Sequence, residues 1–461
     1  MSEQANLPDP RDVRIAELES RNRELEARIK QLEALVESLR RGGKRQAAPF
    51  SRGNPVAEPK KPGRKPGDDY GTKAFRAVPP VIDEKHDAPL PEKCPNCGNN
   101  AFIDERVELQ YQAEIPRRPI YRQFNVKVAR CTCCKKRVQG RHPLQTSDAL
   151  GCCASQIGPE AQAAAAMLNK ELGLSQGKIS RFFQAFFGIK LSRGGSCQIM
   201  LRAAERCAVA HQAIVRHVQA ADVITADETG WRINGRSAWM HAAVCADAVA
   251  YLIDNHRGFQ AMVKLIGEFF AGKLIHDGYA SYDKFLLALH QTCLAHLLRR
   301  CRELLETATR GAVNFPRKVK ALLQKSLEIR DRRDDGQITL KGSRAAATRL
   351  DKQMDTLLAP FKAHQDNERF AAHLWKHAHQ LFTFLRHKNL DATNFRAEQA
   401  IRPAVVNRKV WGGNRTRDGA TAQAILMTVL FTATKNNRDA IEFISQTLCR
   451  RPNDRPMLLT G

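Results

Sequence analysis

Residues 13–41 carry apolar side chains at heptad spacing. Leucine at d and β-branched residues at a, with a single Asn among the a positions, are typical of a parallel two-stranded coiled coil. An amphipathic helix that packs on its own domain is the alternative, but the sustained repeat favours dimerisation. We therefore predict a coiled-coil (leucine zipper) arm over residues 1–41. The d positions are Leu18, Leu25, Leu32 and Leu39, and the a positions are Ile15, Asn22, Ile29 and Val36.

Residues 42–90 lack hydrophobic periodicity and are rich in Pro, Gly, Lys and Arg, which predicts a flexible basic linker. Within it, the segment from Lys60 to Gly67 is similar to an AT-hook, because an arginine flanked by Pro and Gly can enter a narrow minor groove. Contacts with phosphates that carry no sequence specificity are the alternative. Under both interpretations, the predicted DNA-binding residues are Lys61, Arg64 and Lys65.

Two Cys-x-x-Cys pairs follow, one formed by Cys94 and Cys97 and the other by Cys131 and Cys134. Each pair can bind one side of a tetrahedral zinc site from a tight turn. The stretches 107–115 and 121–128 alternate in polarity like the strands of a hairpin, which would bring the pairs together. We predict a structural zinc module over residues 91–145, with buried or redox-active cysteines as the alternative.

Residues 155–220 have the apolar spacing of helices, and we assign residues 146–218 to a helical region. Two segments, beginning at Leu172 and Phe187, show a Gly-containing turn followed by a Ser that can cap the next helix. This order is typical of a helix-turn-helix, but it also occurs in structural helical hairpins. DNA binding by this region is therefore left open.

Alternating apolar positions next predict a meander of three strands. The run 223–227 ends in Asp227, the dipeptide Asn234-Gly235 predicts a hairpin turn, and strands follow at 237–245 and 249–253. A helix at 258–270 and a fourth strand at 273–276 then lead directly into Asp277. Three strands, a helix and a fourth strand, with acids on the first and fourth, are the order of the ribonuclease-H-like fold. We therefore expect the two aspartates to lie side by side.

The stretch 296–390 is helical by pattern and too long for a simple connection, so we predict an inserted helical domain. It divides the core into parts at 219–295 and 391–450, and residues 451–461 form a tail. In the insertion, we expect Trp375 to pack in a core rather than to stack on a base. We expect Cys293 and His296 to be a buried pair that orients the insertion.

The second core part offers a third acid, Glu398, in a helical context. Arg402 follows it by one helical turn and shares its face. We expect Arg402, Arg408 and Lys409 to lie along a DNA backbone. Phosphodiester cleavage and transfer need an attacking and a leaving oxygen stabilised in line across phosphorus, which two divalent ions about 4 Å apart can do. Converging carboxylates suit Mg²⁺ in this role.

Charge and composition narrow the class of protein. The net charge of +26 and the pI of about 9.8 favour a polyanionic partner over the surface of an ordinary metabolic enzyme. The hydrophobic content of 43% excludes a wholly disordered basic tail. We see neither a spanning apolar run nor a signal core, and expect a cytoplasmic, nucleoid-associated protein without membrane contact. In such a chain the 13 cysteines indicate reduced thiols and metal binding.

Several motifs together resemble the IS66 family of bacterial insertion-sequence transposases. The order of zipper, basic linker, zinc-binding segment and helical region is similar too. The resemblance implies a DDE transposase in which Asp227, Asp277 and Glu398 hold two Mg²⁺ or Mn²⁺ ions. The motifs are Asp227-Glu-Thr-Gly-Trp231, His276-Asp-Gly-Tyr-Ala-Ser-Tyr282, Cys293-Leu-Ala-His296, and Asn394-x-x-x-Glu398-x-x-Ile-Arg402 with Arg408-Lys409.

The complete expectation is a multidomain α+β protein with a ribonuclease-H-like core, working as a homodimer or higher oligomer through its coiled coil. Asp227 would bridge both metal ions, while Asp277 and Glu398 would each hold one. The protein would bind terminal inverted repeats, cleave them, and join the freed 3′-hydroxyl to target DNA, with companion transposition proteins as further partners. One alternative is a non-catalytic DNA-binding regulator or accessory subunit, and a second is a nuclease that cuts without joining.

Overall fold

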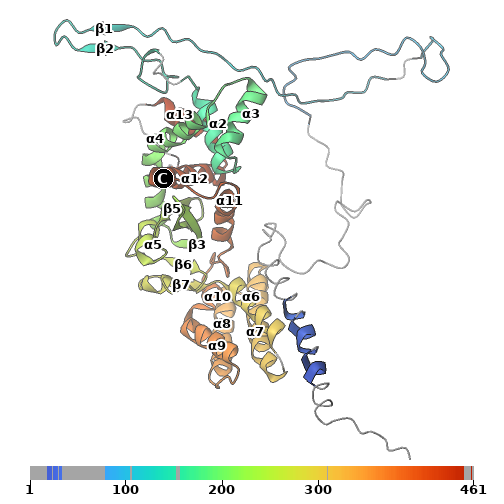
Figure 1. Ribbon diagram of the computed structural model, residues 1–461, viewed down its shortest axis with the longest axis vertical. Helices are drawn as coiled ribbons and strands as arrows, with labels where there is room; N and C mark the ends of the chain where they lie inside the picture. The colour runs from blue at the N-terminus through green and yellow to red at the C-terminus, as the bar shows by residue number, and fades with distance from the viewer. Residues whose placement is uncertain are drawn as a thin grey trace, which may run out of the picture. The chain divides into compact units, whose positions relative to one another are not determined.

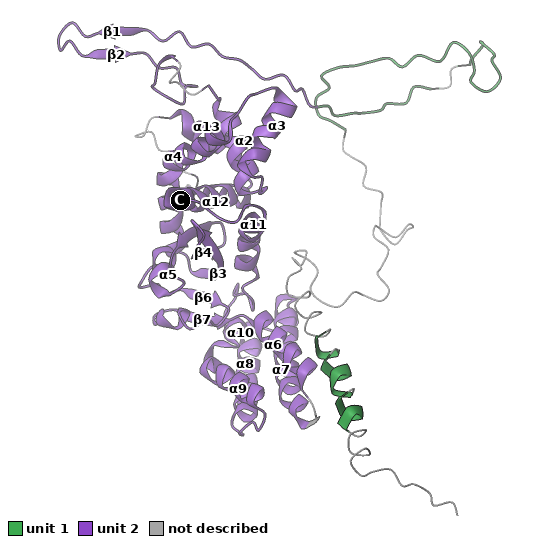
Figure 2. Cartoon of the chain, in the orientation of Figure 1, with its two compact units in different colours: residues 1–114 green, residues 115–461 purple. Residues whose placement is uncertain are grey.

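The computed structural model describes residues 18–22, 24–29, 31–33, 78–103, 106–151, 156–308, 310–450 and 458. The chain forms two compact units, residues 1–114 and 115–461 (Figure 2). In the first unit, the described residues between 18 and 33 are helical, and residues 78–103 contain no helix or strand. Lys61, Arg64 and Lys65 lie outside the described residues, so their contacts with DNA stay a prediction.

The described part of the predicted zipper exposes its apolar positions. Four side chains on the predicted a and d positions are between 52% and 55% exposed in the single chain. They are Leu18, Leu25, Ile29 and Leu32. Such positions in a coiled coil are normally covered by a second helix. Pairing with another chain remains a prediction, as do the positions of Ile15, Val36 and Leu39, which lie outside the described residues.

The hairpin predicted from residues 107–115 and 121–128 is wrong. Apart from Val128, these residues have no regular secondary structure. A shorter antiparallel hairpin, β1 (Val128–Arg130) and β2 (Arg137–Gln139), instead flanks the second cysteine pair. The apolar side chains of the predicted strands are exposed, with Val107 at 90% and Tyr121 at 84%. Alternation alone did not produce strands here because most of these apolar side chains stay exposed, and a hairpin without a packed face is marginally stable.

The predicted helical region is confirmed as three helices, α2 (Pro159–Lys170), α3 (Gln176–Phe187) and α4 (Arg193–Gln219). Ser175 begins α3 by accepting a hydrogen bond from the Lys178 N–H, and Ser192 begins α4 by accepting one from the Gly195 N–H. These are N-caps of the kind expected from the sequence. Buried residues of α2, α3 and α4 share one core with the sheet described next.

A five-stranded sheet with the order β5-β4-β3-β6-β7 forms the centre of the second unit (Figure 1). β3 pairs antiparallel with β4 and parallel with β6, so the predicted meander and fourth strand are confirmed. Asn234 and Gly235 both have positive φ, which suits the tight turn between β3 and β4. The strands are β3 (Val223–Ile233), β4 (Arg236–Val244), β5 (Val249–Asp254), β6 (Lys273–His276) and β7 (Leu289–Thr292).

Helices cover both faces of this sheet, which makes the unit a mixed α+β structure. Helix α5 (Phe259–Ile266), shorter than predicted, packs with α4 in one core. Helix α11 (Phe395–Trp411) packs on the other face together with part of α12 (Arg417–Lys435). Helix α13 (Ala440–Cys449) joins the core of α2 and α4. Within the described part of the chain, no helix is long and apolar enough to cross a membrane.

The predicted insertion is helical and has a core of its own, to which β6 contributes Ile275. The expected burial of Trp375 is wrong, because its side chain is 60% exposed while Phe370 and Leu374 of the same helix enter that core. The elements are α6 (Leu294–Thr307), η4 (Arg310–Val313), α7 (Asn314–Asp334), α8 (Leu340–Leu358), α9 (Gln365–Lys376), η5 (Ala378–Gln380) and α10 (Thr383–Arg386).

Helix α12 closes the outer edge of β5 with a polar stripe. Thr428 Oγ1 accepts a hydrogen bond from the Tyr251 N–H at 3.0 Å. Thr432 Oγ1 accepts from the Val249 N–H and donates to the Val249 carbonyl, both at 3.1 Å. One turn later, the side-chain amide of Asn436 donates to the Asp247 carbonyl at 2.6 Å. The helix thus satisfies backbone groups that an edge strand would otherwise leave unpaired.

Replacing Thr432 with Val should lower the free energy of unfolding by about 1–3 kcal/mol, because a buried N–H and a buried carbonyl of Val249 lose their partner together. Urea unfolding measures the change. Thr432→Ser, which keeps the hydroxyl, should lose less. The control is Thr434→Val, whose hydroxyl bonds only to Leu430 within the same helix. Equal losses in both Val variants would contradict the role of the stripe.

Candidate active site

The pairing of β3 with β6 aligns the two predicted aspartates. Val223 lies opposite Lys273 and Thr225 opposite Ile275 in this parallel pair. Continuing the same register by two residues puts Asp227 opposite Asp277, immediately beyond the end of β6. Asp227 Oδ1 accepts the Glu228 N–H at 3.0 Å, and Asp277 Oδ1 accepts the Tyr279 N–H at 2.8 Å.

Glu398 reaches the same region from the first turn of α11. The helix is fixed on β3 and β4, because Ala397 and Ile401 pack in one core with Trp231. The Glu398 side chain is 34% exposed, and its Oε1 lies 3.5 Å from Nε2 of His296 in α6. Cys293 is buried, as expected, and its N–H donates to the His276 carbonyl at 2.7 Å. His296 is 31% exposed, so the expectation of a buried pair is wrong for this residue. The Cys-x-x-His segment therefore lies between β6 and Glu398.

Asp227 is a shielded carboxylate that has other acids as neighbours. Burial is the largest cause that raises the pKa of Asp227 to about 8, and the charges of Glu228, Asp277 and Glu398 raise it further. Burial and the charge of Asp277 likewise raise the pKa of Glu228. Carboxylates that repel one another in a shielded place favour either a proton or a bound cation.

Helix α9 of the insertion lies against the loop that carries Asp277. Gly278 has φ of +90°, and a Cβ there would lie 3.3 Å from the ring of His373, so both the backbone conformation and the space favour glycine. Farther along the loop, Lys376 Nζ lies 2.6 Å from Asp283 Oδ2. Burial lowers the pKa of His373, which favours the neutral ring. The insertion thus forms one wall of the site.

The predicted DNA-binding residues of α11 differ in their surroundings. Arg402 and Lys409 are exposed. Arg408 is half-buried, and its guanidinium donates to the Gly230 carbonyl and to Thr229 Oγ1 in β3. Arg408 therefore ties α11 to the strand of Asp227, while Arg402 and Lys409 present their charges to solvent.

The four predicted zinc ligands lie on two turns of the same shape. In the first unit, the Gly98 N–H donates to the Cys94 carbonyl at 2.8 Å, and the Cys94 N–H donates to Asn99. In the second unit, Lys135 and Lys136 make the equivalent bonds with Cys131. Gly98 and Lys135 both have positive φ.

In each turn, backbone N–H groups that include the second cysteine of the pair hydrogen-bond to the first thiol and lower its pKa. This arrangement favours the thiolate of Cys94 and of Cys131. Each turn thus presents two cysteines in the way that a thiolate metal site requires.

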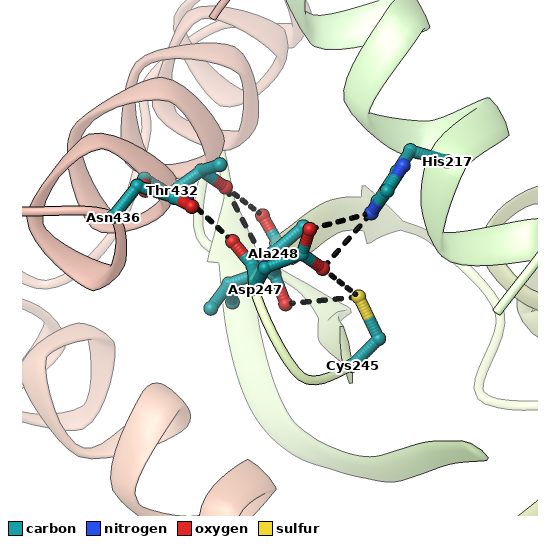
Figure 3. A network of polar contacts seen from close by, with 7 residues as sticks. His217, Cys245, Asp247, Ala248, Thr432 and Asn436 are labelled. Carbon is teal, nitrogen blue, oxygen red and sulfur yellow. Dashed lines mark hydrogen bonds and ion pairs between the residues drawn. The ribbon is translucent and has the colours of Figure 1, made fainter. Parts of the chain in front are cut away.

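A separate group of His217, Cys245 and Asp247 lies where α4 meets the turn between β4 and β5 (Figure 3). His217 Nε2 lies 2.9 Å from both oxygens of Asp247, and the Cys245 thiol donates to Asp247 Oδ1 at 3.3 Å. Burial would raise the pKa of Asp247, but the hydrogen bonds from His217 and Cys245 lower it overall. Their mutual hydrogen bonds give these side chains a structural role, fastening α4 to the sheet.

Comparison with known proteins identifies the family. A family model described as "Transposase IS66 family" matches residues 154–422, which is more than half of the chain and includes all three acids. The chain belongs to the IS66 family of transposases. Membership supports a transposase role, DNA as partner, a nucleotidyl-transferase type of reaction and the use of a divalent metal. Comparison with curated proteins gives no match.

Four residues beside the acids or in contact with their partners were not predicted as site residues: Glu228, Arg257, His296 and His373. Glu228 and His296 lie in the motifs that carry the resemblance, so their positions were visible in the sequence although their contacts were not. Arg257 and His373 lie in no such motif. Only the fold brings them beside the acids, so the sequence carried no signal for them.

Replacing Asp227 with Asn should stabilise the metal-free protein, and more so at higher pH. With a folded pKa of about 8 against about 4 when unfolded, folded wild-type protein keeps a proton that the unfolded chain releases. Wild-type stability therefore falls as the pH rises from about 4 to 8, and the Asn variant avoids this loss. Thermal unfolding without added divalent metal measures the free energy of unfolding of both proteins. The gain of Asp227→Asn over the wild type should be larger at pH 8.5 than at pH 5 by more than about 1 kcal/mol.

The matched control is Asp222→Asn, since Asp222 lies just before the strand of Asp227 but its side chain is 78% exposed. If the stability gain of Asp227→Asn did not change with pH, ionisation of Asp227 would not be what destabilises the metal-free wild type.

Proposed function

We propose that this protein is a DDE transposase with Asp227, Asp277 and Glu398 as its catalytic residues. The observation that carries the proposal is geometric, because the parallel register of β3 and β6 puts Asp227 opposite Asp277. Burial raises the pKa of Asp227, and the charges of Glu228, Asp277 and Glu398 raise it further, which agrees with that placement. The strand order supports the further assignment of the sheet to a ribonuclease-H-like core, in which these acids stand on neighbouring strands and a covering helix.

The donor set fits divalent cations such as Mg²⁺ or Mn²⁺. Carboxylate oxygens are the preferred ligands of these hard ions. Arg257 is the arginine next to the acids in the part of the second unit that the structure describes from residue 156 onward. It forms its ion pair with Glu228. The carboxylates of Asp227 and Asp277 are therefore available to bind a cation. When bound, a pair of such ions would activate the attacking oxygen and stabilise the leaving oxygen of an in-line displacement at phosphorus.

The chain's own residues would bind and orient both the ions and the DNA. Asp227 would contribute a ligand from β3, Asp277 from the loop after β6, and Glu398 from α11, where His296 can hold its carboxylate in place. Arg402 and Lys409 extend from the helix of Glu398 and would contact phosphates. The net charge of +26 would supply attraction to DNA at long range.

In this proposal the reaction proceeds in two displacements, cleavage at terminal inverted repeats and attack of the freed 3′-hydroxyl on target DNA. Two ends must be brought together, so a dimer or higher oligomer is required. The half-exposed Leu18, Leu25, Ile29 and Leu32 support pairing through the N-terminal helix. We also expect the protein to associate with the nucleoid and to act with companion transposition proteins.

Asp227→Asn should reduce strand transfer by at least about 100-fold while leaving binding to the element's ends nearly unchanged, because the substitution removes a metal ligand and not a phosphate contact. The assay incubates the protein with DNA carrying the element's ends, target DNA and Mg²⁺ or Mn²⁺, and scores nicked and joined products separately. Asp222→Asn is the control, since this exposed acid pairs with Lys273 outside the site. Normal joining by Asp227→Asn would refute the catalytic assignment.

We further propose that Cys94, Cys97, Cys131 and Cys134 together bind one structural Zn²⁺. The support is the equivalence of the two turns in hydrogen bonding and in backbone conformation. Four thiolates complete a closed tetrahedral site, which leaves zinc no open position for catalysis.

Purified protein should contain about one Zn²⁺ per chain, measured by elemental analysis or with a chromogenic chelator. Cys94→Ser or Cys131→Ser should reduce this content strongly, because each removes one thiolate of the set. Cys197→Ser is the control, since Cys197 is an exposed cysteine of α4 outside both turns. Unchanged zinc content in both Cys94→Ser and Cys131→Ser would rule out the site.

A further inference from the structure

Glu228 follows Asp227 in β3 but has no free carboxylate oxygen. Its side chain is fully buried. Oε1 accepts hydrogen bonds from Nε of Arg257 at 2.8 Å and lies 2.8 Å from Nη2 of the same guanidinium. Oε2 accepts the hydroxyl of Tyr282 at 2.8 Å. A buried carboxylate is costly unless it is paired and hydrogen-bonded, and Glu228 meets both conditions.

The guanidinium of Arg257 continues this connection toward Asp277. It lies 3.9 Å from the ring centroid of Tyr279 and 4.7 Å from that of Trp239, so it stacks on both rings. The N–H of Tyr279 in turn donates to Asp277 Oδ1 at 2.8 Å. Arg257 therefore links the strand of Asp227 to the residue that orients the carboxylate of Asp277.

Tyr282 makes a second link from Glu228 to the same loop. Its side chain is only 1% exposed, and its ring stacks on His276, with centroids 4.8 Å apart. His276 is the last residue of β6, so Tyr282 folds the loop back onto the end of its own strand. Tyr279 and Tyr282 thus attach both parts of the loop 277–282 to Glu228, one through Arg257 and one directly.

We propose that Glu228, Arg257 and Tyr282 form a clamp that holds Asp277 beside Asp227 and thereby positions the two carboxylates for a divalent cation. This inference rests on the proposed function. Asp277 stands beyond the last paired residue of β6, so no strand pairing opposes its repulsion by Asp227. Because Arg257 and Glu228 neutralise each other, the clamp holds the loop without cancelling the negative potential that attracts a cation.

The three clamp residues are positioning residues, and a readout other than activity can test them. Mn²⁺ binding to the full-length protein is measured by electron paramagnetic resonance, alongside affinity for DNA carrying the element's ends. We expect Tyr282→Phe to weaken Mn²⁺ binding about 3–10-fold and Arg257→Ala more than about 10-fold, with little change in DNA affinity. Arg257→Lys should recover only part of the loss, since it keeps the charge but not the planar stacking group.

Two matched variants control for general damage to the fold. Thr447→Val removes another buried hydroxyl, which donates to the Phe443 carbonyl within α13 at 2.8 Å, without touching the loop or α11. Arg330→Ala removes an arginine of similar exposure, 31% against 36% for Arg257, that pairs with Asp331 in α7. Both controls should bind Mn²⁺ like the wild type.

The outcomes separate this inference from the function on which it rests. If Asp227→Asn binds Mn²⁺ like the wild type, the proposed metal site itself is overturned. If Asp227→Asn loses Mn²⁺ while Tyr282→Phe and Arg257→Ala keep it, only the clamp is overturned. If Arg257→Ala loses DNA affinity but not Mn²⁺, Arg257 is a phosphate contact and the clamp is again overturned.

Discussion

Burial of a carboxylate next to other acids is the constraint on which the site in the second unit depends. Burial and the charges of Glu228, Asp277 and Glu398 raise the pKa of Asp227 to about 8. Ionisation of Asp227 therefore destabilises the metal-free fold. The surrounding structure has to offset that cost from contacts that do not involve the acids. It does so through strand pairing on one side of Asp227, helix packing on another, and hydrogen bonds that fix the loop of Asp277.

The elements that meet this constraint come from distant parts of the chain. The register of β3 and β6 aligns two acids, and α11 returns after the whole insertion to bring the third. Helix α12 then covers the edge of β5 with Thr428, Thr432 and Asn436, so that the sheet ends without unpaired backbone groups on that side. The insertion adds α9 against the loop of Asp277. The site is therefore held from several directions, and its parts do not depend on a single loop.

These physical features favour an enzyme over a protein that only binds DNA. A regulator could replace Asp227 with a neutral residue and become more stable, whereas a metal-dependent enzyme needs the charge that makes the site costly. The chain keeps its three predicted acids and, in addition, the buried Glu228 with a complete set of partners. Membership in a transposase family agrees with this interpretation. Joining as opposed to cutting depends on how two DNA ends are brought together, which is a property of the assembly and not of one site.

The sequence by itself determined the local elements and indicated three candidate acids. Polarity alternation predicted β3 to β6, and Ser175 and Ser192 marked helix starts, because these features depend on short-range geometry. The placement of Asp227 beside Asp277 was expected from the strand order of the ribonuclease-H-like fold, and the parallel register of β3 with β6 agrees with it. Alternation failed over residues 107–115 and 121–128, where most apolar side chains stay exposed. Only the tertiary structure decided that Trp375 is exposed, and that Arg257 pairs with Glu228. The reason is that packing and ion pairs join residues far apart in the sequence, and no local period records which of them will meet.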